Sequence, residues 1–160
     1  MLDNKFKKYL DRKLDRTLPE YKEKYTKGFS QLNFTDRNSD FIDFWTTFND
    51  EIPAKDGFLP AFCSQVLDFE NSITSILRRD FGLPEIFYTL FNFEFDDYMF
   101  YDKDTDEVFL VLAPDLKKFI NDRFYDKKWA SFVDFIKDQL NYKKWIFNQK
   151  LNIPFSFFVS

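Results

Sequence analysis

The stretch IFYTLFNFEFDDYMFYDKDTDEVFLVLA, residues 86–113, decides the fold. Its two ends are rich in aromatic and branched side chains, which favour β-strands. A run of acidic and small polar residues separates these ends, and such a run between two strand-like segments predicts a hairpin turn at 101–107. Pro114 then ends the β region, because proline cannot donate to a strand ladder. Antiparallel strands are therefore expected at the centre of the domain.

Helical periodicity surrounds this β region. Apolar side chains recur every three or four positions, which predicts helices at 2–16, 39–50, 69–81, 115–125 and 127–147. Ser39 or Asp40 is expected to cap the second of these, and Gly82 to end the third in the left-handed conformation. The sequence FCSQVLDF at 62–69 is interpreted as a short strand that runs into a helix.

Composition excludes several chemistries. The 160 residues include 24 Phe, no His, one Cys and three Gly. Histidine metal sites and Ser-His or Cys-His nucleophiles are therefore impossible, and loops that cradle phosphate need more glycine than this. Cys63 is expected to be a buried structural thiol. Paired carboxylates could catalyse glycoside hydrolysis, but no spacing singles out a pair. A non-catalytic protein without a cofactor is expected.

One segment resembles the start of a calcium-binding loop. Asp102, Asp104 and Asp106 occupy its positions 1, 3 and 5. The match then fails, because Glu107 stands where the tight-turn glycine is needed and Ala113 where the bidentate glutamate is needed. No metal site is therefore expected.

Charge is unevenly placed along the chain. Residues 1–27 hold nine basic and five acidic residues, whereas the whole chain has a net charge of −4, so the remainder carries −8. The densest acidic stretch, 94–107, has seven carboxylates and one lysine. A negative body repels nucleic acid and attracts a basic protein. The alternative interpretation is that these acids only keep a Phe-rich protein soluble.

The basic segment at 1–30 is predicted to be a helical arm interrupted by Pro19 and Gly28. A basic amphipathic helix can lie on a membrane, but this one is short and carries acids, so packing on the protein body is favoured. No signal peptide is visible and the longest apolar run, 108–113, cannot span a bilayer. A single cytoplasmic domain over 1–160 is expected. The apolar tail at 141–160 is a C-terminal extension, whose last residues form an edge strand or a flap.

The order of motifs at 36–140 resembles the SUKH superfamily, which joins a yeast regulator of cell-wall synthesis to many bacterial immunity proteins. DFIDFWTTFND resembles its early tryptophan helix, and GFLPAFCSQVLDF its step from strand to helix. LPEIFYTLFNFEFDDYMFYDKDTDEVFLV resembles the central hairpin, and WASFVDFIKDQL the closing helix. The chain departs from the pattern where Asn49-Asp50 and Asp96-Asp97 replace glycines, and where residues 115–125 add a helical segment.

The resemblance implies an α+β fold with a single twisted, mainly antiparallel sheet flanked by helices, to which this chain adds an N-terminal helix. It also implies a bacterial immunity protein of a polymorphic or contact-dependent toxin system, which binds a cognate toxin domain, a basic nuclease, and occludes its active site. Neither nucleic acid nor membrane is an expected partner. The alternative is a protein–protein adaptor domain without a toxin. The residues expected to bind the partner are Glu94, Asp96, Asp97, Tyr98, Tyr101, Asp102, Asp104, Asp106 and Glu107.

Overall fold

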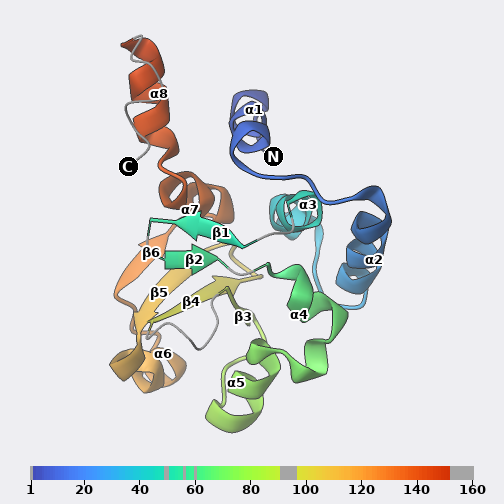
Figure 1. The fold of residues 1–160 in the computed structure, drawn as a ribbon. Helices are drawn as coiled ribbons and strands as arrows, with labels where there is room; N and C mark the ends of the chain where they lie inside the picture. Colours follow the sequence, from blue (N-terminus) through green and yellow to red (C-terminus); the bar gives the residue numbers. More distant parts are fainter. Residues whose placement is uncertain (1, 49–50, 56, 60, 91–96, 152–160) are drawn as a thin grey trace.

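The computed structural model describes residues 2–48, 51–55, 57–59, 61–90 and 97–151. A four-stranded antiparallel sheet forms its centre, in the order β3-β4-β5-β6. These strands are β3 (Phe87–Thr89), β4 (Asp97–Asp102), β5 (Val108–Leu112) and β6 (Lys127–Trp129). A separate two-stranded ribbon joins β1 (Ile52–Ala54) to β2 (Gly57–Leu59). The predicted α+β fold with one antiparallel sheet flanked by helices is confirmed (Figure 1).

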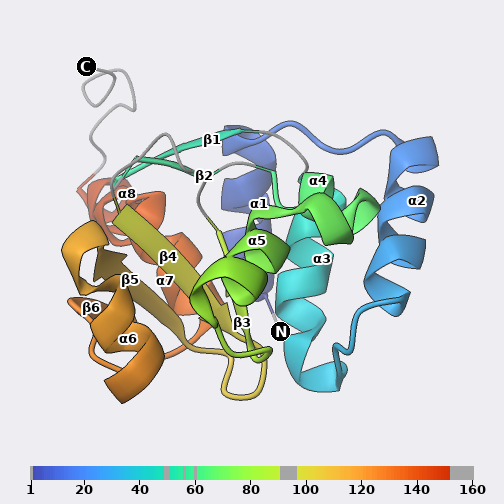
Figure 2. The same ribbon diagram turned by 90° about the horizontal axis from the view of Figure 1, so that it is seen from below.

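Helices cover both faces of the sheet (Figures 1 and 2). On one face, Phe87, Phe100 and Phe109 pack with residues of α5 (Ile73–Phe81) and α6 (Leu116–Asp122). On the other face, Met99 and Tyr101 join the larger cluster, which draws on α1 (Asn4–Lys13), α2 (Pro19–Ser30), α3 (Ser39–Thr47), α4 (Cys63–Leu67), α7 (Phe132–Gln139) and α8 (Tyr142–Lys150). Alternate side chains of β4 are therefore buried on opposite sides of the sheet.

The basic N-terminal helices belong to the core. Leu2, Phe6 and Leu10 from the first segment and Phe29 from the second are buried in the larger cluster. Asp3 caps α1 by accepting a hydrogen bond from the Phe6 amide at 2.8 Å. The lysines and arginines stay on the solvent side, as an amphipathic helix requires. Among the described residues no helix is long and apolar enough to cross a bilayer.

Gly28 lies inside α2 and does not break it, contrary to the sequence-based prediction. A Cβ atom built at this position would lie 2.4 Å from Val66 Cγ1 and 3.2 Å from the Val66 carbonyl oxygen of α4. The glycine is therefore needed for the close approach of two helices and not for a turn. Pro19 is the first residue of the same helix, where its missing N–H costs nothing.

Gly28→Ala is expected to lower the free energy of unfolding, although alanine is the better helix former. Overpacking against Val66 costs about 1–3 kcal/mol, and the helix propensity of alanine returns about 1 kcal/mol, so a net loss of up to about 2 kcal/mol remains. Urea unfolding followed by circular dichroism measures it. Val66→Ala in the same chain should recover part of the loss, because it removes the closer of the two contacts. A more stable Gly28→Ala protein would contradict this packing.

Three further boundaries differ from the prediction. Residues 63–67 form helix α4, where a short strand running into a helix was expected. Asn38 with a short 3-10 turn precedes α3 in place of a Ser39 or Asp40 cap. The helix predicted at 127–147 is a strand followed by two helices. Its first residues form β6, then the Ser131 side chain caps α7, and Asn141 in the left-handed conformation separates α7 from α8. Gly82 ends α5 as predicted, at φ 74°.

Candidate functional site

The turn between β4 and β5, residues 102–107, is the candidate functional site because it holds most of the acidic residues predicted to bind a partner. The Asp102 side chain organises its backbone, since Oδ1 accepts hydrogen bonds from the amides of Asp104 at 2.8 Å and Thr105 at 3.3 Å. The Asp102 carbonyl also accepts from the Asp106 amide at 2.9 Å. Asp102 is 6% exposed, so its carboxylate serves the turn and not a partner.

Tyr101 is fully buried beneath this turn. Its ring stacks on Phe41 of α3, with 4.0 Å between the ring centroids. Its hydroxyl accepts a hydrogen bond from Asn38 Nδ2 at 2.7 Å and donates one to Asp106 Oδ1 at 2.9 Å. Burial raises the pKa of Tyr101, so the phenol stays protonated and remains a donor. The prediction that Tyr101 contacts a partner is therefore wrong, because its side chain is fully buried.

Asn38 connects the β4–β5 turn to the segment that precedes α3. Besides its hydrogen bond to Tyr101, its side chain donates to the Lys103 carbonyl at 2.8 Å and accepts from the Thr35 amide at 2.9 Å. The residue is 1% exposed, and a buried side-chain amide satisfied in this way rigidifies its surroundings. On the neighbouring loop, the Asn33 carbonyl accepts a hydrogen bond from Lys103 Nζ at 3.0 Å. Sequence reasoning missed Asn38, whose only signal was an asparagine just before a helix.

Asp106 joins the turn to the start of α7. It adopts the left-handed conformation at φ 65°, which aspartate tolerates better than most residues. Its Oδ2 accepts from the Phe132 amide at 3.4 Å. Burial raises the pKa of Asp106, and the hydrogen bonds from Tyr101 and Phe132 offset only part of this rise. Asp106 is thus a half-buried structural carboxylate.

The remaining predicted residues divide by exposure. Asp104 is exposed, and Glu107 is partly exposed and pairs with Lys128 Nζ at 2.8 Å. Asp97 and Tyr98 are half-buried at the other end of β4, so the structure does not bring them together with the turn. Glu94 and Asp96 lie outside the described residues. Of the nine predicted contacts, Asp104 is the one described residue whose side chain is exposed and not buried or half-buried.

The loop that leads into α3 supplies a second exposed carboxylate. Asp36 belongs to the same 3-10 turn (Asp36–Asn38) as Asn38 and is open to solvent. The hydrogen bonds of Asn38 and Asn33 hold this loop against residue 103. The β4–β5 turn and the start of α3 also meet at one end of the molecule in Figure 2. We call the surface formed by Asp36, Asp104 and Thr105 the acidic tip.

The other reactive side chains of the described residues have structural surroundings. Cys63 donates to the Trp45 carbonyl at 2.9 Å, and burial raises the pKa of its thiol to about 12. This fits the buried structural thiol that the sequence predicts. No cluster of three or more His, Cys, Asp or Glu side chains suited to a metal ion occurs within the described part of the chain.

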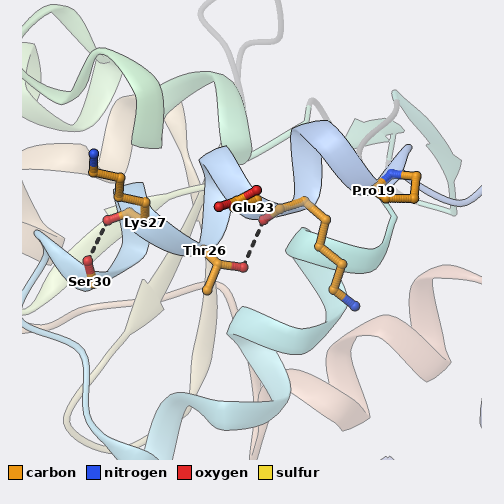
Figure 3. A pocket seen from close by; sticks show the side chains of 6 residues that line it. Pro19, Glu23, Thr26, Lys27 and Ser30 are labelled. Carbon is orange, nitrogen blue, oxygen red and sulfur yellow. Dashed lines mark hydrogen bonds between the residues drawn. The ribbon is translucent and has the colours of Figure 1, made fainter.

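A broad hollow of about 550 Å³ follows the outer side of α2 (Figure 3). Its hydroxyl groups are engaged by the helix itself, since Thr26 Oγ1 donates to the Lys22 carbonyl at 2.8 Å and Ser30 Oγ to the Lys27 carbonyl at 2.5 Å. Such bonds from serine and threonine to preceding carbonyls are local helix features. The described residues that line this hollow carry both positive and negative charges, and their hydroxyl groups bond to the helix backbone.

A smaller pocket of about 280 Å³ lies between α1 and α8 and is lined by Tyr9, Arg12, Lys13, Trp145 and Gln149. The rings of Tyr9 and Trp145 lie 4.9 Å apart at 52°. Asp3 and its ion pair with Lys137 lie at the N-terminal end of α1, whereas Arg12 and Lys13 lie in its last turn. Comparison of the chain with family models, with curated proteins and with solved structures gave no match.

Proposed function

We propose that this chain is a non-catalytic, toxin-neutralising immunity protein that resembles the SUKH superfamily and binds a basic toxin domain through its acidic tip. The observation that carries the proposal is the support beneath the β4–β5 turn. Three side chains from separate elements, Asn38, Tyr101 and Asp106, hold this turn in one conformation. A preorganised loop loses little entropy on binding, which favours tight association.

Charge supports a basic partner. The chain carries −4 overall, and Asp36 and Asp104 are exposed and form no ion pair within the described ranges. Exposed carboxylates accelerate the encounter with a positively charged surface and contribute less to the lifetime of the complex. A nuclease domain has such a surface because it must hold phosphates. Occlusion of that surface would inhibit the toxin without any chemistry by this chain.

The test uses the toxin domain at the end of a large secreted protein, where the reading frame next to this gene encodes such a protein. Surface plasmon resonance with a catalytically inactive variant of this toxin domain is expected to give one-to-one binding. The association rate should fall as the salt concentration rises. Asp36→Lys with Asp104→Lys should slow association about tenfold at low salt and change dissociation much less. Neither residue supports the core, so circular dichroism should show an unchanged fold.

Glu23→Lys on the outer side of α2 is the control, because it makes at another exposed site the change that each of the two substitutions makes, a carboxylate replaced by lysine. Its association rate should stay within about twofold of the unaltered protein, since a single distant charge is screened. Failure of the toxin domain to bind this chain would overturn the proposed function. If the association rate depends neither on salt nor on the Asp36→Lys and Asp104→Lys substitutions, the role of the acidic tip is overturned. That result would favour an adaptor that uses an apolar surface.

A further inference from the structure

The pocket between α1 and α8 has a composition that the proposed function does not use. Its wall is aromatic, because Tyr9 and Trp145 face each other across the helix interface. The Tyr9 hydroxyl donates to the Leu140 carbonyl, and burial raises the pKa of Tyr9 to about 12. Tyr9 therefore presents an uncharged ring to the pocket and no free hydroxyl.

Two cations border these rings. Arg12 and Lys13 occupy the last turn of α1, and Lys13 Nζ lies 6.0 Å from the centroid of the Tyr9 ring. Within the described part of the chain Arg12 has no hydrogen bond or ion pair, in contrast to Arg16, which binds Asp11 at 2.8 Å. An unpaired guanidinium at a pocket rim can bind phosphate or carboxylate through two parallel hydrogen bonds.

The helix dipoles do not cancel this charge. The pocket lies at the C-terminal ends of α1 and α8, since Arg12 and Gln149 belong to their last turns. Each C-terminal end carries about half a negative charge, whereas Arg12 in the last turn of α1 and Lys150 in the last turn of α8 each carry a full positive charge. The rim therefore stays positive in a protein whose net charge is negative.

We propose that this pocket binds a small organic anion with a flat ring, of the nucleoside monophosphate class. The ring would stack on Trp145, the phosphate would bind the Arg12 guanidinium, and the Gln149 amide can donate to and accept from a base edge. A volume of about 280 Å³ lies just below that of pockets for drug-sized ligands, which limits the ligand to one nucleotide. A longer strand would meet the negative remainder of the chain. This proposal is independent of toxin binding.

The experiment titrates adenosine 5′-monophosphate into the full chain and follows tryptophan fluorescence. Trp145 is half-buried at the pocket, whereas Trp45 and Trp129 are 0% and 6% exposed, so quenching reports on the pocket. Saturable quenching is expected, and Arg12→Gln should weaken it at least tenfold. Trp145→Phe should keep binding, measured by calorimetry, but remove the fluorescence change. Arg16→Gln, whose side chain is exposed on the neighbouring segment, should bind like the unaltered chain.

Three comparison ligands make the test decisive. Adenosine and inorganic phosphate should each bind at least tenfold more weakly than the nucleotide, because each lacks one half of the recognised structure. Equal binding of adenosine would overturn the role of the cations, and equal binding of phosphate would overturn the role of the rings. Equal or tighter binding of a single-stranded oligoadenylate would overturn the choice of a free nucleotide. Absence of saturable binding would overturn the whole proposal.

Discussion

Phe41→Ala will lower the free energy of unfolding by about 3–5 kcal/mol. Phe41 is fully buried and its ring contacts aromatic side chains from several elements. Its ring centroid lies 4.0 Å from Tyr101, 4.9 Å from Phe62 and 4.8 Å from Phe132. Removal of this ring leaves a cavity between the sheet, α4 and α7, and the neighbouring rings are too rigid to fill it. Urea denaturation followed by far-ultraviolet circular dichroism measures the loss.

Phe147→Ala is the matched control for this change. Phe147 has the same side chain but is 61% exposed on α8, so its truncation should change stability by no more than about 0.5 kcal/mol. If Phe41→Ala unfolds with a loss below about 1 kcal/mol, Phe41 cannot be the packed centre of the aromatic cluster. If its fold is too unstable to purify, Phe41→Leu should still unfold at clearly lower urea than Phe147→Leu, because leucine restores only part of the volume.

The helices that the sequence predicted best are those with a strong periodic aromatic face. Phe41, Phe44 and Trp45 recur at helical spacing and are all fully buried in α3. This succeeds because burial of rings dominates the local energetics. Prediction failed where long-range packing decides the structure. Gly28 is indistinguishable in sequence from a turn glycine, and only the approach of Val66 from a distant segment explains it.

In the candidate site, too, the local structure was predicted from the sequence and the long-range contacts were not. The sequence placed a hairpin turn at 101–107, and a turn joins β4 to β5 there. The count of acidic residues did not reveal which carboxylates face solvent. The Asp102 carboxylate accepts hydrogen bonds from backbone amides, and the Asp106 carboxylate accepts one from the Tyr101 hydroxyl. These bonds depend on the geometry of the turn and on the contact between Asn38 and Tyr101, which are 63 positions apart in the sequence. Net charge predicts long-range attraction but not the location of each charge.

Tyr101→Phe will lower the free energy of unfolding by about 1–3 kcal/mol at neutral pH, because Asn38 and Asp106 each lose a buried hydrogen-bond partner. The cost should shrink as pH falls. Burial raises the pKa of Asp106 in the folded protein, and the Tyr101 hydroxyl lowers it in part. The native state therefore binds the Asp106 proton more readily than the unfolded state does. The contribution of this carboxyl to stability is greatest below its unfolded pKa and declines as pH rises through the folded pKa.

Loss of the Tyr101 hydroxyl will raise the pKa of Asp106 further, so the penalty at pH 7 should exceed the penalty at pH 4 in urea titrations at the two values. Asp106→Asn keeps the left-handed backbone and an acceptor oxygen but cannot titrate. In that background the cost of Tyr101→Phe should not depend on pH, and the double-mutant cycle isolates the coupling between the two side chains. Tyr98→Phe, on the same strand and half-buried, should cost little at either pH. A Tyr101→Phe penalty that is equal at pH 4 and pH 7 would mean that the phenol and the Asp106 carboxylate are not coupled, and the turn would then owe its conformation to Asp102 and Asn38 alone.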